Sequence, residues 1–280
     1  MRGDLSTRGN AVPSDHIAPG LVSALERVTV APGALAATVD GREVTAKSPH
    51  DMTSKLAGAL YDAIHVGRTQ PRATRQRSLR DARLDAMFAA AMPFTHTAVT
   101  ATLHLRAAQV AVVAIAGLRL EIPASLVPSS AAVGDEVSLR LPAARPALSP
   151  GFFLADGSAG SGSVGAATLR LYAHLADPDS AAGAWHAALT RLEGLRLHYR
   201  AKVLSARSEY PRHDALVIYL GRRGWGAVLD VAEEIRDAVP IEAATSPFTH
   251  CVAPGISVAW EPRDLRPGQR GLSFGQHRAH

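Results

Sequence analysis

The chain has 280 residues, of which 47% are hydrophobic and 20% charged, an ordinary balance for a globular protein and enough length for two lobes. The net charge of +5 leaves substrate phosphate, nucleic acid and acidic peptide open as partners. A single cysteine, Cys251, excludes an intramolecular disulfide and a cysteine-based zinc site. The N-terminus has no apolar signal region and no apolar run reaches membrane-spanning length, so we expect a cytoplasmic protein that does not enter a membrane.

The first part of the chain carries local signals for helices and one hairpin. We expect a flexible tail over 1–18 and a short helix over 20–28. The dipeptide Asp40-Gly41 predicts the turn of a hairpin. A helix over 48–67 has a serine at its N-cap, a proline at its first position and a glycine at its end. A second amphipathic helix is predicted over 78–91.

Strand signals then dominate up to a glycine- and serine-rich stretch, "GSAGSGSVG", over 157–165. This stretch is the clearest flexible segment, and we expect a boundary between two lobes there. The predicted division is a tail over 1–18, an N-terminal helical and β lobe over 19–156, a linker or loop over 157–165, and a C-terminal lobe over 166–280.

The C-terminal lobe shows a regular order of elements. Its predicted segments are strand 168–175, helix 180–194, strand 197–205, strand 214–220, helix 225–238 and strand 250–260. The order β-α-β-β-α-β is that of a ferredoxin-like lobe, in which both helices cover one face of the sheet. We therefore predict an α+β protein with this lobe packed against an N-terminal lobe of helices and antiparallel strands.

The other face of that sheet carries polar and ionisable side chains. In strand 168–175 the leucines alternate with a polar set, and strand 197–205 alternates in the same way. The residues expected on the free face are Arg170, Tyr172, His174, His198, Arg200 and Lys202. This face is either a solvated sheet surface or an anion-binding surface covered by the first lobe.

Four C-terminal motifs resemble the HopA-type effector family. They are "RAKVL", "YPRHDALVIYL", "FTHCVAPGISVAWEP" and "SFGQHRAH", and the resemblance is strongest over about 166–280. The family includes bacterial type III effectors and proteins encoded beside peptide-modifying enzymes of thioamitide and class V lanthipeptide pathways. In those pathways the resemblance implies a carbon–oxygen lyase without a cofactor. A kinase-like phosphotransferase phosphorylates a precursor peptide with its leader, and the lyase eliminates phosphate to leave dehydroalanine or dehydrobutyrine.

Elimination of phosphate needs a base for the Cα proton and cations for the phosphate. Lys202 is the candidate base; its amine must then be neutral, which neighbouring arginines and burial would favour. The alternative is an exposed lysine without a catalytic role. Arg212 is the first candidate for binding phosphate, because its planar guanidinium matches phosphate geometry. Asp214 would orient Arg212 or Lys202, or form a simple salt bridge, and Tyr210 would donate a hydrogen bond, act as a second base or merely pack.

Further candidates lie outside the strand 214–220. Arg278, Arg200 and Arg68 are candidate phosphate ligands. His65 and His250 are candidate general acids, with structural or surface roles as the alternative. The 12 histidines form no His-x-His or HExxH pattern, so we predict no metal.

Other functions are consistent with the same residues. A non-catalytic subunit that binds the phosphopeptide or stabilises the kinase would use the same arginines, and an effector that binds a host protein is a further alternative. A ferredoxin-like RNA binder would need aromatic side chains on the free face, where only Tyr172 qualifies, so we expect no nucleic acid partner. The basic stretch 68–83 is either a solvated loop or a dock for the kinase or an acidic peptide.

Overall fold

A computed structural model describes residues 17–68, 81–146, 148–162, 167–262 and 272–280. Most of the predicted tail over 1–18, most of the basic stretch 68–83 and the last part of the linker 157–165 lie outside these residues. None of the described helices combines the length and apolar character needed to cross a membrane.

The N-terminal elements form a small unit of helix and hairpin. They are α1 (Pro19–Leu25), β1 (Val28–Val30), β2 (Ala36–Val39), β3 (Arg42–Thr45), α2 (Pro49–Leu60) and a π-helix, η2 (Tyr61–Val66). The predicted hairpin is confirmed: Asp40 and Gly41 have φ of 50° and 73°, as a type I′ turn requires. The Ser48 side chain caps α2 by accepting a hydrogen bond from the Asp51 N–H, and Gly67 ends the helical run at φ 78°.

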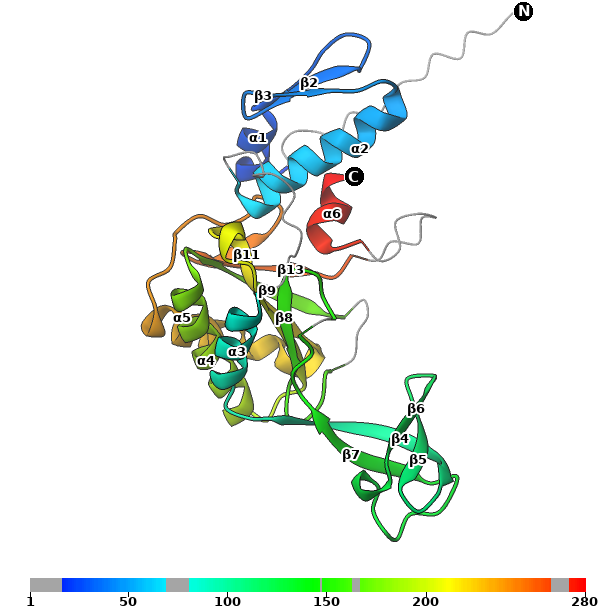
Figure 1. Cartoon of the computed structure of the whole chain (residues 1–280). Helices are drawn as coiled ribbons and strands as arrows, with labels where there is room; N and C mark the ends of the chain where they lie inside the picture. Colours follow the sequence, from blue (N-terminus) through cyan, green and yellow to red (C-terminus); the bar gives the residue numbers. More distant parts are fainter. Residues whose placement is uncertain (1–16, 69–80, 147, 163–166, 263–271) are drawn as a thin grey trace, which may run out of the picture.

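A second sheet extends away from the rest of the molecule (Figure 1). Its strands are β4 (His96–Arg106), β5 (Val110–Ile115), β6 (Leu118–Pro123) and β7 (Glu136–Pro142), in the order β6-β5-β4-β7, with a short 3-10 helix, η3 (Ala124–Leu126), after β6. Before it comes α3 (Ala82–Ala90), whose N-cap Asp81 places the helix start later than the predicted 78. This helix packs against α4 rather than against the second sheet.

The third sheet is the ferredoxin-like one that the sequence predicts. Its core elements are β9 (Leu169–Leu175), α4 (Pro178–Gly194), β10 (Tyr199–Leu204), β11 (Arg212–Leu220), α5 (Val228–Ala238) and β13 (Ile256–Trp260), with two 3-10 helices, η4 (Arg207–Glu209) and η5 (Arg222–Ala227). The order β13-β9-β11-β10 is the 4-1-3-2 order of that fold, and all neighbours are antiparallel. The α+β class and the ferredoxin-like lobe are confirmed, whereas the division into lobes stays a prediction.

Two additions widen this sheet to six strands. β8 (Phe152–Asp156) pairs with β10 at one edge, and β12 (His250–Ala253) pairs with β13 at the other. The prediction of one strand over 250–260 is therefore wrong. The chain reverses between the two strands at Gly255, where φ of 73° suits a glycine.

Helices cover one face of the six-stranded sheet and part of the other. On one face α3, α4 and α5 enclose the main core, which includes the fully buried Trp185. On the other face α6 (Phe274–Ala279) and η2 lie over Tyr172 and Val217. Tyr172 and Arg170 are 3% and 8% exposed, so this part of the free face is not a solvated surface.

An irregularity in β11 determines which side chains reach that second face. Arg212 pairs with Leu175, but Leu216 pairs with Ala173, so the pairing is irregular between Arg212 and Leu216, with two extra residues on β11. Side chains normally alternate along a strand, but in this irregular stretch the consecutive residues Ala215 and Leu216 both belong to the main core. As a result Arg212 and Asp214 lie on the same face as Val217, although simple alternation would place them on opposite faces.

Candidate active site

A buried ion pair occupies the beginning of β11. Arg212 donates to the two carboxylate oxygens of Asp214 from Nε and Nη2, at 2.7 and 2.8 Å. The two residues are only 4% and 5% exposed. Burial alone would raise the pKa of the Asp214 carboxyl, but the charge and hydrogen bonds of Arg212 outweigh it, and the pKa lies well below its usual range.

The ion pair is linked to the N-terminal helix by further polar contacts. Arg212 Nη2 also donates to the Tyr61 hydroxyl at 3.1 Å, and burial together with the nearby Asp214 raises the pKa of Tyr61 to about 12. Glu209 lies 3.6 Å from Arg212 Nη1 and 2.5 Å from Arg68 Nη2. Arg68 also pairs with Asp62 at 3.0 Å. The predicted phosphate ligands Arg212 and Arg68 are thus both engaged by carboxylates.

His65 is enclosed beside this pair. Its Nε2 lies 3.8 Å from Asp214 Oδ2, and its Nδ1 is 3.1 Å from the Ser246 hydroxyl. Four aromatic rings surround the imidazole, those of Tyr61, Tyr172, Phe248 and Phe274. Burial lowers the pKa of His65 to about 4, so the ring is neutral at pH 7.

Phe152 brings Lys202 and Arg212 together. The Lys202 Nζ lies 4.2 Å from the centre of the Phe152 ring, and Arg212 Cζ lies 5.6 Å from the same centre. The contact follows from the pairing of β8 with β10, in which Phe152 is opposite Leu204 and Lys202 opposite Leu154. Lys202 and Arg212 thus contact the same ring, but Arg212 is not among the described residues that line the pocket of Lys202.

Lys202 also lines a pocket of about 290 Å³ on the free face, here called the Lys202 pocket. Its other polar lining residues are Arg170, Arg200, Tyr219, Glu261, Ser149, Ser161 and Thr168. Arg170 pairs with Glu261 at 2.6 Å, and Arg200 pairs with Asp156 at 2.7 Å. Lys202 has no carboxylate partner in the part of the chain that the structure describes. The pocket can therefore hold an anion beside an unpaired amine.

Three predicted site residues lie elsewhere. Tyr210 packs against the main core, and its hydroxyl donates to the Leu204 carbonyl at 2.6 Å. His250 is exposed on the edge strand β12. Arg278 lies on α6, with Cζ 5.4 Å from the centre of the Phe274 ring. Of all the predicted site residues, Lys202 and Arg200 are the two found among the described residues that line the Lys202 pocket.

Several residues of the site were not among the sequence candidates. Alternation in β9 placed Arg170 on a face that could bind an anion, but Arg170 was not among the candidate phosphate ligands. Phe152 and Glu261 carry no local signal, because each reaches the site through pairing with a strand distant in sequence. Among the described residues, no group of three or more His, Cys, Asp or Glu side chains is placed to hold a metal ion.

The fold and the pocket define an α+β protein with a cation-lined hollow on the free face of a ferredoxin-like sheet. Residues 143–280 match the model of the HopA1 effector protein family. The resemblance drawn from the C-terminal motifs is thereby confirmed. A search of curated proteins gave no match.

Two solved structures of effector proteins also match. That of Pseudomonas syringae pv. syringae strain 61 is 18% identical with a TM-score of 0.36, and covers 46% of this chain and 49% of its own. That of Pseudomonas syringae pv. tomato strain DC3000 is 16% identical with a TM-score of 0.35, and covers 46% and 49%. The match spans about half the length of each effector.

Proposed function

We propose that the protein is a carbon–oxygen lyase that eliminates phosphate from phosphoserine or phosphothreonine of a ribosomally synthesised peptide. One observation carries the proposal: the unpaired amine of Lys202 lines the same pocket as the guanidinium groups of Arg170 and Arg200. A phosphate ester requires cations for its two negative charges, and elimination requires a base beside them.

The proposed step uses the pocket residues in distinct roles. The Lys202 amine takes the Cα proton, and the electron pair of that C–H bond forms the Cα=Cβ double bond. The Cβ–O bond breaks, and phosphate leaves with its electron pair. The ammonium formed on Lys202 returns a proton to the departing phosphate. The products are inorganic phosphate and dehydroalanine from serine, or dehydrobutyrine from threonine.

The buried Arg212–Asp214 pair has a positioning role in this scheme. Arg212 is held by Asp214 and contacts the Phe152 ring that also carries the Lys202 amine. A fixed ring keeps the amine directed at the pocket. His65, which is neutral at pH 7 because burial lowers its pKa to about 4, is a poor general acid there and is assigned to the same positioning network.

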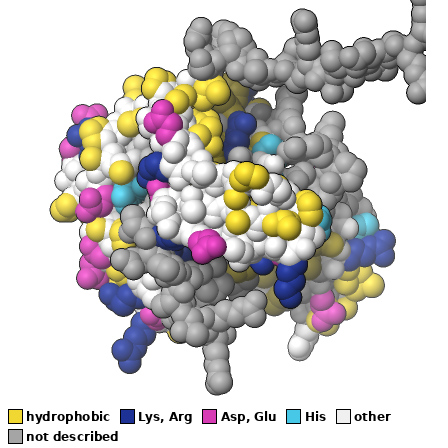
Figure 2. All heavy atoms as spheres, turned by 90° about the horizontal axis from the view of Figure 1, so that it is seen from above, with side chains coloured by type: hydrophobic (Ala, Val, Ile, Leu, Met, Phe, Trp, Pro, Cys, Tyr) yellow, Lys and Arg dark blue, Asp and Glu magenta, His cyan; other side chains and the backbone are white. Residues whose placement is uncertain are grey.

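The family supports a setting for this reaction. A kinase-like phosphotransferase would supply the phosphopeptide, whose leader travels with it, and the reaction would take place in the cytoplasm without a cofactor, a membrane or a nucleic acid. On the face seen in Figure 2, acidic and basic side chains are interspersed rather than gathered by sign. Among the described residues of that face, Figure 2 shows no basic stripe of the kind that follows a nucleic-acid backbone.

A non-catalytic function would use the same cations. A phosphopeptide-binding or kinase-stabilising subunit, or an effector that grips a host phosphoprotein, needs Arg170 and Arg200 but no base. The relation to proteins described as effectors favours keeping this second candidate.

The test is incubation of the purified protein with a synthetic phosphopeptide, followed by mass spectrometry for loss of phosphoric acid. Lys202→Ala should still bind the phosphopeptide but slow elimination by about 10²–10⁴-fold. Lys47→Ala, at an exposed lysine outside the pocket, is the matched control and should eliminate at the parent rate. Phosphopeptide that stays intact, with and without a kinase-like neighbour, would overturn the enzyme proposal, and unchanged elimination by Lys202→Ala would reject Lys202 as the base.

A further inference from the structure

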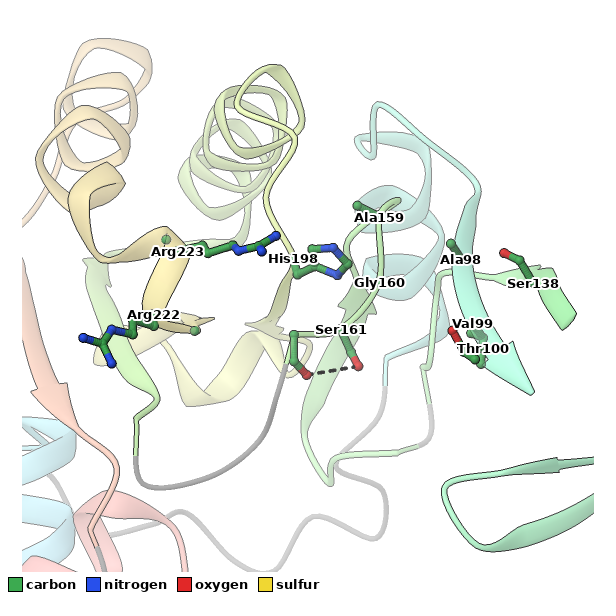
Figure 3. A pocket seen from close by; sticks show the side chains of 13 residues that line it. Ala98, Val99, Thr100, Ser138, Ala159, Gly160, Ser161, His198, Arg222 and Arg223 are labelled. Atoms are coloured by element: carbon green, nitrogen blue, oxygen red, sulfur yellow. Dashed lines mark hydrogen bonds between the residues drawn. The ribbon is translucent and has the colours of Figure 1, made fainter. Parts of the chain in front are cut away.

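A second pocket, of about 480 Å³, lies where the projecting sheet meets the ferredoxin-like lobe and is here called the β4 pocket (Figure 3). One wall is Ala98, Val99 and Thr100 of β4, with Ser138 of β7. The opposite wall carries His198, Arg222 and Arg223. Arg223 extends toward His198, whereas the Arg222 guanidinium is directed away from the pocket, 5.9 Å from the centre of the Trp225 ring. No aspartate or glutamate is among its described lining residues. The pocket is therefore suited to negative charge.

The β4 pocket adjoins the Lys202 pocket. Ser161 and Gly221 line both hollows. A chain that placed one residue beside Lys202 could therefore continue past these two residues into the β4 pocket without crossing the core.

Where β4 borders this pocket, part of its main chain has no neighbouring strand on the side away from β7. The N–H of Ala98 donates to the Ser158 carbonyl at 2.8 Å, on the side away from β7. β5 pairs with β4 only from Thr102 onward. Because alternate residues of a strand direct their N–H and C=O groups to the same side, those of Thr100 face the pocket between these two contacts. No described residue bonds to them there.

Glycines keep the wall opposite this edge close to the strand. Gly160 has φ of +123°, and a Cβ on it would lie 3.0 Å from His198 Nδ1 and 3.3 Å from the Ala98 carbonyl oxygen. A Cβ on Gly162 would lie 3.2 Å from the His198 carbonyl oxygen. Side chains at either position would narrow the passage, so the glycines preserve a space bordered by backbone.

We infer that the β4 pocket binds an acidic segment of the same peptide in extended form, next to its phosphorylated residue. The inference rests on the proposed function for the identity of that residue. Main-chain groups of the segment pair with Thr100, as when a peptide adds a strand to an open sheet edge. Its aspartate or glutamate side chains meet Arg223, whose guanidinium group matches carboxylate geometry and extends toward His198.

The test measures binding separately from chemistry. A fluorescent, unphosphorylated peptide rich in Asp and Glu is compared by anisotropy with its twin in which Asn and Gln replace the acids. We expect the acidic peptide to bind at least about tenfold more tightly, with the difference shrinking as salt increases. The double variant Arg222→Glu with Arg223→Glu should abolish this preference. Arg119→Glu, an exposed arginine on β6, should keep it.

A backbone variant tests the strand edge without changing charge. Thr100→Pro deletes an N–H that has no partner, and proline is tolerated at such an edge position, so circular dichroism should show an unchanged fold. We expect it to weaken binding of the acidic peptide by about tenfold. Equal binding of the acidic and neutral peptides, or full binding by both the charge and the proline variants, would overturn the inference. Selective binding without elimination of any phosphopeptide would support the inference while refuting the proposed lyase.

Discussion

The guanidinium of Arg212 and the carboxylate of Asp214 form two parallel hydrogen bonds inside the protein, although only one residue separates them along the strand. Both side chains are almost completely buried, at 5% and 7% exposure. A buried pair of this kind is costly to break because the remaining charge loses both its partner and water. The pair therefore holds the beginning of β11 in one arrangement.

Removing one member of the pair should destabilise the fold strongly. In Asp214→Ala the Arg212 guanidinium stays buried without its carboxylate, and we expect the free energy of unfolding to fall by about 3–5 kcal/mol. Urea denaturation measures this change. Asp230→Ala breaks the half-exposed Arg191–Asp230 pair and should cost about 1 kcal/mol or less. Equal losses in the two variants would contradict the assignment.

His65 should make stability depend on pH. Burial lowers its pKa from the ordinary 6.5 to about 4, so the unfolded chain binds a proton at a higher pH than the folded protein does. The contribution of His65 to the free energy of unfolding is therefore fully present above pH 6.5. It is lost as the pH falls from 6.5 through 4, by roughly 3 kcal/mol in all. His213, whose pKa burial also lowers to about 4, contributes in the same range.

A histidine variant measures how much of this pH dependence of stability is due to His65. We expect His65→Gln to reduce the decline in stability between pH 6.5 and 4. Urea denaturation at each pH measures this decline. His104→Gln, at an exposed position on β4, should retain the decline of the parent. The same slope in all three proteins would show that His65 is not the group responsible.

The Phe152 ring should matter for catalysis through its contact with Lys202. Phe152→Leu removes the ring face against which the Lys202 amine and the Arg212 guanidinium rest, and the contact with the guanidinium is worth about 0.5–2 kcal/mol. We expect elimination of phosphate to slow by about 3–30-fold, with phosphopeptide affinity changed less. Phe152→Tyr keeps the ring and should restore the rate. A leucine variant as fast as the parent would argue against this positioning role.

The contact between α6 and the imidazole leaves no room for a methyl group. A Cβ added at Gly275 would lie 2.1 Å from His65 Cδ2, and the enclosed ring cannot move away. Gly275→Ala should therefore cost about 1–3 kcal/mol and expose α6 to proteolysis. Gly58→Ala on the exposed side of α2 meets nothing within 4 Å and should stabilise the protein by about 0.5–1 kcal/mol. Wild-type stability and protease resistance in Gly275→Ala would refute the close packing.

The sequence was sufficient to predict features that depend on residues close together in the chain. Asp40-Gly41 both tolerate positive φ, and Ser48 can cap a helix without help from distant residues. Alternating leucines in 168–175 distinguished the core face from the face that carries Arg170. The order of strands and helices then predicted the ferredoxin-like topology, because that order admits few sheet arrangements.

Features that depend on distant contacts could not be predicted in this way. The polar residues at the start of β11 were expected to cluster, but the irregular pairing between Arg212 and Leu216, which accompanies their position on the free face, has no clear local signal. The pairing of β8 with β10 brings Phe152 to Lys202 from 50 positions away. His65 reaches Asp214 only because the π-helix η2 packs on the sheet, and its roles as acid or positioning residue could not be separated before its burial was known.

The last residues of the chain keep water away from His65, since Phe274 and Gly275 of α6 lie directly against its ring. A proteolytic cut before Phe274 would hydrate the imidazole and let it take up a proton near pH 6.5. Nuclear magnetic resonance of the ring would register this shift. Loss of a single short helix would thereby turn a histidine that is inert at neutral pH into one whose charge responds to the acidity of the cell.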